Sequence, residues 1–137
     1  MKLIISTVVV GIVLFLLGWV IYGMLFADFF KEYFGHMQRS ETDMKIWAFA
    51  LANFGQAFMM YLIYSKGYQG GSPVMEGIKF GILIGLFWTI PYVLFTWGGM
   101  TVKYQGVVVD GIIGFIMTLI AAVITAIIHG KKEVKAA

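Results

Sequence analysis

Residues 77–85 read Gly-Ile-Lys-Phe-Gly-Ile-Leu-Ile-Gly (GIKFGILIG), with a glycine at every fourth position. In water this spacing weakens a helix, because each interior glycine costs about 1 kcal/mol relative to alanine. In a bilayer the same spacing is useful, because small residues let two helix backbones approach closely. Gly77, Gly81 and Gly85 therefore predict a glycine zipper, one face of a helix that packs against another helix.

A matching row of small residues lies later in the chain. Gly114, Thr118 and Ala122 are again four residues apart, and Ala126 continues the row. Two such rows on consecutive antiparallel helices predict a tight helical hairpin. A pore or ligand groove along the rows is the alternative, and a homo-oligomeric contact through the glycine face is a further one.

The composition predicts an all-α integral membrane protein. Hydrophobic residues make up 61% of the 137 residues, against roughly 45–50% in ordinary globular chains. Charged residues make up 12%, about half the usual share, and the mean hydropathy is +0.90. A water-soluble domain of this size has too much surface relative to its volume to bury so many apolar residues.

Four apolar segments are each long enough to cross a hydrocarbon core, which takes about 20 helical residues. They cover residues 3–26, 46–65, 74–97 and 106–128. A segment in lipid must satisfy its own backbone hydrogen bonds, so each is predicted to be helical. The first has a longer apolar run than a cleaved signal peptide and is expected to be retained. Short loops join the later segments, which predicts one domain, an antiparallel four-helix transmembrane bundle over residues 1–137.

Basic residues predict the orientation. Six lie on the side that holds both termini and the second loop, and four lie on the other side. The six are Lys2, Lys66, Lys79, Lys131, Lys132 and Lys135, and the four are Lys31, Arg39, Lys45 and Lys103. This difference predicts an inner (plasma) membrane protein with both termini in the cytoplasm. The formal charge of +3 is accounted for by these topology signals, so no nucleic-acid partner is expected.

The sequence lacks the motifs of common enzymes and cofactor sites. There is no cysteine, no GxSxG, no HExxH, no phosphate-binding glycine loop and no GxGxxG. His36 and His129 are expected on opposite faces of the membrane, so they cannot clamp one haem. His36 with Glu32 gives only two possible metal ligands, and solvated loop residues are the simpler interpretation. We therefore expect no enzyme activity, no cofactor and no metal.

Polar residues inside the predicted spans are the better functional candidates. Asn53 and Gln56 lie near the middle of the second span, three residues apart and so on one face. An amide facing lipid costs several kcal/mol, so both are expected to point into the bundle or toward a partner. They serve either as interhelical hydrogen-bonding groups or as the lining of a polar cavity.

Asp110 begins the fourth span, on the same row as Gly114 and Thr118. It is either an acid matched to the helix dipole or a carboxylate that handles a proton or a cation. Thr89 continues the glycine row of the third span, and Pro91 is expected to kink that span. The predicted polar cavity thus contains Asn53, Gln56, Thr89 and Asp110. Four aromatic residues at this level form either core or the wall of a shallow pocket: Trp19, Tyr22, Trp88 and Tyr92.

The stretch GIVLFLLGWVIYGMLFADFF (residues 11–30) resembles the start of a family of small bacterial four-span membrane proteins known as a domain of unknown function. In that family a glycine and an aromatic pair precede a tyrosine–glycine/proline–phenylalanine stretch. The matching positions are Gly18, Trp19, Tyr22, Gly23 and Phe26. Here Val20 and Ile21 separate the two aromatic residues. Glu76-Gly77 and Asp110-Gly111, which start the third and fourth spans, are also compatible. The resemblance implies the four-span architecture and no known activity.

Two functions remain open at this stage. The paired small-residue rows favour a non-enzymatic membrane protein that forms an oligomer or is an accessory subunit of a membrane complex, with the lipid bilayer as its surroundings. The alternative is a small transporter or channel that uses Asn53, Gln56 and Asp110.

Overall fold

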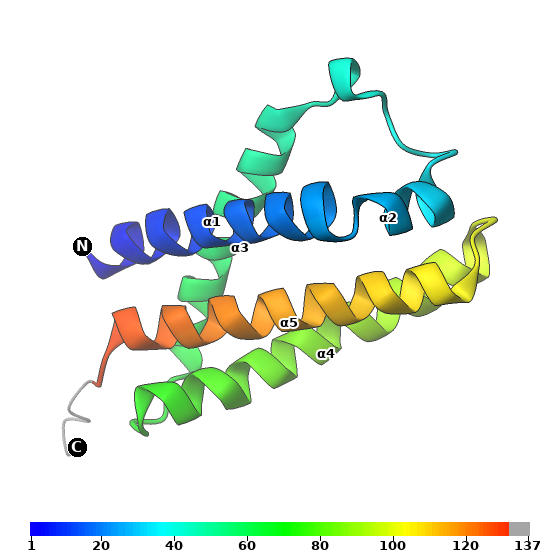
Figure 1. Ribbon diagram of the computed structural model, residues 1–137. Helices are drawn as coiled ribbons and strands as arrows, with labels where there is room; N and C mark the ends of the chain where they lie inside the picture. Colours follow the sequence, from blue (N-terminus) through cyan, green and yellow to red (C-terminus); the bar gives the residue numbers. More distant parts are fainter. Residues whose placement is uncertain (132–137) are drawn as a thin grey trace.

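The computed structural model describes residues 1–131, and within them it contains helices and no strand. The elements in order are α1 (Lys2–Val20), a π-helical turn η1 (Ile21–Leu25), α2 (Ala27–Phe34), a 3-10 turn η2 (Glu41–Asp43), α3 (Ile46–Gly67), α4 (Pro73–Gly99) and α5 (Tyr104–His129) (Figure 1). Lys132 and Lys135, which entered the orientation prediction, lie outside the described residues.

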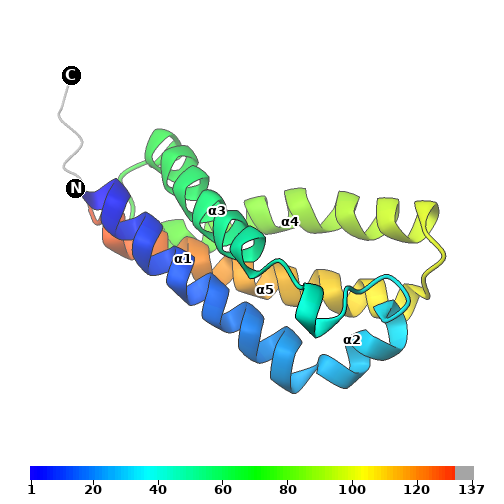
Figure 2. The ribbon, with the colours of Figure 1, turned by 90° about the horizontal axis from the view of Figure 1, so that it is seen from above.

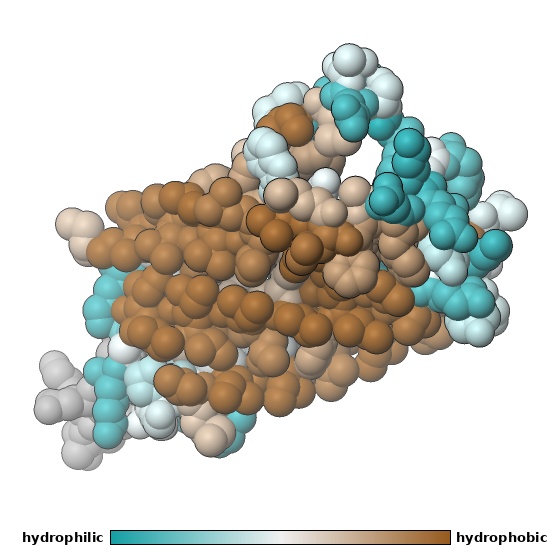
Figure 3. All heavy atoms as spheres, in the orientation of Figure 1, coloured by the Kyte–Doolittle hydropathy of each residue, from teal (hydrophilic) through white to brown (hydrophobic). Residues whose placement is uncertain are grey.

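Four helices are long and apolar enough to cross a membrane: α1 continued through η1, α3, α4 and α5. Each begins and ends within two residues of the predicted span. The prediction of an all-helical chain is confirmed for the described residues, and the four helices indicate a multi-pass membrane protein. Figure 3 shows apolar residues covering one long face of the molecule, while hydrophilic residues gather at its two ends. This distribution suits helices whose sides face hydrocarbon.

The helix α5 lies at the centre of the molecule and packs against α1, α3 and α4. In both ribbon views α1, α4 and α5 run lengthwise, with α5 opposite in direction to the other two (Figures 1 and 2). By contrast, α3 crosses them steeply in Figure 1. The apolar core joins three of the helices and consists of Val10, Leu14, Ala57, Met60, Ala121 and Ala122.

The glycine row of α4 lies directly against α5. A Cβ atom added to Gly77 would lie 2.8 Å from the Cβ of Ala126 and 2.8 Å from the Cα of Val123. At Gly81 the added atom would lie 3.0 Å from the Cβ of Ala122. Any larger residue would therefore push the two backbones apart. The close approach of the two helices at these positions depends on glycine.

A second antiparallel seam joins α1 to α5 over nearly their whole length. At one end, Lys2 Nζ donates a hydrogen bond to the His129 carbonyl oxygen at 2.7 Å. At the other end, the Tyr22 hydroxyl donates to Asp110 Oδ1 at 2.6 Å. We call these the Lys2 end and the Asp110 end of the molecule. The two bonds fix the register of the first helix against the last.

Candidate functional site: a pocket at the Asp110 end

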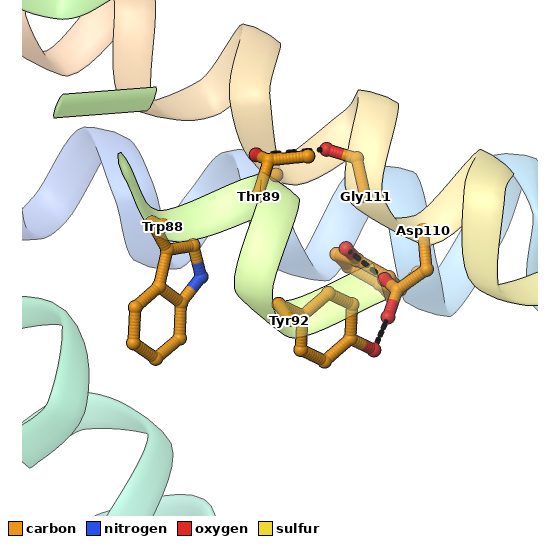
Figure 4. A pocket seen from close by; sticks show the side chains of 7 residues that line it. Trp88, Thr89, Tyr92, Asp110 and Gly111 are labelled. Atoms are coloured by element: carbon orange, nitrogen blue, oxygen red, sulfur yellow. Dashed lines mark hydrogen bonds between the residues drawn. The ribbon is translucent and has the colours of Figure 1, made fainter. Parts of the chain in front are cut away.

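A cavity of about 200 Å³ opens between η1, α4 and α5 at the Asp110 end (Figure 4). Its lining combines one carboxylate, one hydroxyl-bearing aliphatic residue, three aromatic residues and two glycines. These residues are Tyr22, Trp88, Thr89, Tyr92, Asp110, Gly111 and Gly114. The cavity is therefore a small pocket with one acidic group and a largely aromatic wall.

The Asp110 carboxylate accepts hydrogen bonds at both of its oxygens. The Tyr22 hydroxyl donates to Oδ1, and the Tyr92 hydroxyl donates to Oδ2. The three residues come from three elements, so the carboxylate ties the end of the first helix to α4 and α5. Hydrogen bonds to an ionised group are stronger than bonds between neutral groups. The two tyrosines thus fix the position of the acid inside the pocket.

The π-helical turn and α2 together position Tyr22. In η1 the Phe26 N–H donates to the Ile21 carbonyl oxygen, five residues earlier, at 2.8 Å. Single π-turns of this kind are frequently found at functional sites. After the turn, α2 folds back so that the ring of Phe30 packs on the Tyr22 ring, with centroids 4.7 Å apart. Phe30 is buried. Packing against Phe30 of α2 therefore helps to hold the Tyr22 ring in place.

Two glycines shape the floor of the pocket. A Cβ at Gly111 would lie 2.5 Å from Val93, so this glycine permits the close contact with α4. The Thr89 hydroxyl donates to the Gly111 carbonyl oxygen at 3.4 Å. Gly114 has no neighbouring atom within 4 Å of its added Cβ. Gly114 was expected in the packing row, but it lines open space instead. The next residue, Phe115, meets α4 instead, because its ring lies against Gly85.

The pocket contains only part of the predicted polar cavity. Thr89 and Asp110 line it, whereas Asn53 and Gln56 are not among the lining residues. The Asn53 side-chain amide donates to the Phe49 carbonyl oxygen of its own helix at 2.8 Å, and Gln56 is exposed. Of the four residues predicted to share a cavity, this pocket brings together Thr89 and Asp110. Because α3 crosses the other helices steeply, it carries this face away from the pocket.

The aromatic residues divide in a similar way. Tyr22, Tyr92 and Trp88 line the pocket, whereas Trp19 is 61% exposed and lies outside the lining. Figure 4 shows Tyr92 turned toward the carboxylate and Trp88 one turn away along α4. Aromatic faces attract cations, and a carboxylate adds a full negative charge. The pocket is therefore suited to a small, positively charged ligand.

The same chemistry makes a multivalent metal a poor match. Across residues 1–131, no group of three or more His, Cys, Asp and Glu side chains could hold a metal ion. Magnesium and calcium require several oxygen ligands, of which carboxylates are the commonest. Asp110 instead offers one negative charge whose two oxygens already accept bonds from tyrosines.

Comparison with known proteins finds no family model, no curated protein and no solved structure that matches this chain. The resemblance to the four-span family thus remains an expectation, and the case for a function depends on the geometry of the pocket.

Sequence reasoning identified the acid and the aromatic residues but not their pairing. Tyr22 and Asp110 are separated by 88 positions, and their contact depends on the register of α1 against α5. No short motif carries that information. The only signal available was that both residues lie at the same predicted depth in the membrane.

Proposed function

We propose that this protein is a small, non-enzymatic transporter or channel of the inner membrane that binds a monovalent cation in the Asp110 pocket. In this proposal the four long helices cross the bilayer in alternating directions, as an antiparallel bundle with a tilted α3. Both termini face the cytoplasm, and the pocket opens toward the opposite side. The basic residues at the Lys2 end support this orientation.

The carboxylate held by two tyrosines carries the proposal. An ionisable side chain within a membrane span is costly, and such groups usually mark ligand or ion pathways. A helix dipole alone would favour an acid in the first turn of α5, but Asp110 is the seventh residue of that helix. The two tyrosine donors and the adjoining cavity are not needed for helix capping. A binding role accounts for the position of the acid, for its two tyrosine donors and for the adjoining cavity.

The size and polarity of the pocket favour an organic ammonium ion. Its volume of about 200 Å³ admits a small ligand and excludes drug-sized molecules, whose pockets are typically about 300–1,000 Å³. Aromatic walls recognise quaternary ammonium groups through the negative faces of their rings. Asp110 would neutralise the charge, while Trp88 and Tyr92 would contact the methyl groups.

The test compares choline with its uncharged isostere, 3,3-dimethyl-1-butanol, by calorimetric titration of the purified protein. Choline is expected to bind at least about tenfold more tightly than the isostere, a difference of about 1.4 kcal/mol. Asp110→Asn should remove this preference, because it keeps the shape of the side chain and removes its charge. The control is Asp43→Asn, which removes an exposed acid outside the long helices. Equal choline binding by the Asp110→Asn protein would rule out the proposed site.

A second candidate function, an oligomer or an accessory subunit, is supported by a different face. Gln56 is exposed on α3, near the middle of a predicted span. An amide in this position gains by hydrogen bonding to a neighbouring helix rather than facing lipid. Gln56→Leu should then reduce crosslinking between copies or to a partner in native membranes, while Met59→Leu on the same exposed face should not. Identical crosslinking by all three proteins would remove the motive for this candidate.

A further inference from the structure

Three buried hydroxyl groups lie near the Lys2 end, on three different helices. Ser6 of α1 and Thr125 of α5 have exposed fractions of 0%, and Tyr64 of α3 has an exposed fraction of 2%. None of the three hydroxyl oxygens has a hydrogen-bond partner within the part of the chain that the structure describes. An unsatisfied buried polar group costs about 1–3 kcal/mol, and ordered water commonly removes that cost.

The register of the α1–α5 seam brings two of these hydroxyls together. Lys2 bonds to the carbonyl oxygen of His129. Ser6 lies four residues after Lys2, and Thr125 lies four residues before His129. The two helices are antiparallel, so one turn forward from Lys2 in α1 and one turn back from His129 in α5 reach the same level. Ser6 and Thr125 therefore lie opposite each other. Both side chains are fully buried, so they face the seam and not the lipid.

Aromatic residues of α3 enclose the imidazole ring of His129 at this end. The ring centroids of Tyr61, Tyr64 and Tyr68 lie 5.6, 5.2 and 5.0 Å from the His129 centroid. Among the described residues, Lys2 lies at this end through its bond to the His129 carbonyl oxygen, and Glu76 of α4 lies close to Tyr64. His129 is itself fully buried. The seam thus ends at a buried imidazole ring.

Four polar residues of α5 lie on one stripe that begins at the pocket. Asp110, Thr118, Thr125 and His129 are separated by 8, 7 and 4 residues. At about 100° per residue they lie within an arc of about 100° on one side of the helix. Thr118 is also buried. The carboxylate, the two hydroxyls and the imidazole therefore share one side of α5.

We propose that this stripe is a gated proton route between the Asp110 pocket and His129. Water held by Ser6 and Thr125 forms the part of the route next to His129, and buried apolar residues separate this water from the pocket. The inference rests on the proposed function and identifies the proton as a second cation for the same carboxylate. A proton from water binds Asp110 and then passes to water in the seam. A ring nitrogen of His129 accepts it and releases it to water at the Lys2 end. One positive charge crosses per proton, and both residues return to their starting states.

An apolar plug makes this route gated. Between Thr118 and Thr125 the seam is filled by Val10 and Ala121, both fully buried, with Leu14 beside them. Seven residues separate the two threonines, which is about 10 Å along the helix axis. A proton cannot cross this distance without intervening water. Protons should therefore pass only when water enters the plug, and the flow should be slow at rest.

Proton uptake into liposomes tests the route. The protein is reconstituted with an internal pH dye, and a potassium gradient with valinomycin supplies the voltage. Thr125→Val keeps the shape of the side chain and removes its hydroxyl, so it should slow proton uptake at least about tenfold, equivalent to about 1.4 kcal/mol in the barrier. The matched control is Thr7→Val, because the Thr7 hydroxyl donates to the Leu3 carbonyl oxygen of its own helix at 2.8 Å.

Two further variants keep the test decisive if Thr125→Val folds poorly. Val10→Ser adds a hydroxyl inside the plug and should speed proton uptake, an effect that misfolding into an inactive protein does not produce. The chain contains no cysteine, so Ser6→Cys introduces a single thiol. That thiol should react with a small, charged thiol reagent added from the Lys2 side, because water reaches it.

The outcomes separate this inference from the proposed function. Wild-type protein that binds choline but carries no proton current would overturn the route and leave the binding site standing. The same conclusion follows if Thr125→Val and Thr7→Val conduct equally, or if the thiol at position 6 is inert. Absence of both choline binding and proton current would overturn both proposals.

Discussion

Replacing Gly77 by alanine tests the packing that holds α4 against α5. The added methyl group would lie 2.8 Å from the Ala126 Cβ and 2.8 Å from the Val123 Cα. Both neighbours belong to, or are attached directly to, the α5 backbone, so neither can turn aside as a long side chain would. The helices must separate locally, which also weakens the contact one turn away at Gly81.

The expected magnitude follows from these contacts. Overpacking a tight contact costs about 1–3 kcal/mol, so Gly77→Ala should lower the free energy of unfolding by that amount. The matched control is Gly55→Ala, because an added Cβ at Gly55 has no atom within 4 Å. That control should change the free energy by less than about 0.5 kcal/mol. The loss of unfolding free energy in Gly85→Ala should lie between those of the other two variants, since the nearest neighbour of the added Cβ is the ring of Phe115, which can rotate.

The assay is a titration of the protein from mild detergent micelles into SDS, followed by tryptophan fluorescence and far-UV circular dichroism. Helices persist in SDS, so the higher helix propensity of alanine largely cancels between the folded and unfolded states. The comparison therefore isolates the contact between helices. Equal unfolding free energies for the Gly77→Ala and Gly55→Ala proteins would refute the reasoning, because the two sites differ chiefly in the space around the added methyl group.

Two other features give testable expectations. Gly106→Ala should detach α2 from α5, because the added Cβ would lie 2.7 Å from the Cβ of Tyr33. Faster amide hydrogen exchange in α2 would show this detachment, and unchanged exchange would contradict it. Lys45 and Arg39 hold the pKa of the Asp43 carboxyl below its usual value through hydrogen bonds of 2.9 and 2.8 Å. A lowered pKa means that these ion pairs persist at neutral pH and are lost only as the pH falls through that value. An NMR titration should show the low midpoint rising as salt is added, whereas a midpoint independent of salt would argue against the ion pairs.

The parts of the fold that the sequence predicted well are those governed by local physics. Each long helix lies within two residues of its predicted span, because membrane thickness and backbone hydrogen bonding dictate both its length and its conformation. The spacing of Gly77, Gly81 and Gly85 likewise marked one face of α4, since residues four apart share a helix face. The π-helical turn at Ile21–Leu25 had no such local signal in the sequence.

The site was predicted only in part. The sequence singled out Asp110 as an ionisable residue in an apolar segment. The free-energy cost of placing such a residue in a membrane can be recognised without a structure. It grouped Asn53 and Gln56 with Asp110 because all three are polar residues within spans. Polarity alone does not say in which direction a helix turns its faces, and the steep crossing of α3 carries the amides away from the carboxylate.

What the sequence by itself determined is therefore the helical character of the chain and its four long apolar helices, which follow from hydrophobicity and from the need of an apolar segment to satisfy its own backbone hydrogen bonds. What only the tertiary structure decided is which distant side chains meet. The Tyr22, Tyr92 and Asp110 cluster depends on the register of three helices, to within a fraction of a turn. A shift of one residue turns a side chain by about 100° around its helix, so no local pattern can fix such a meeting in advance.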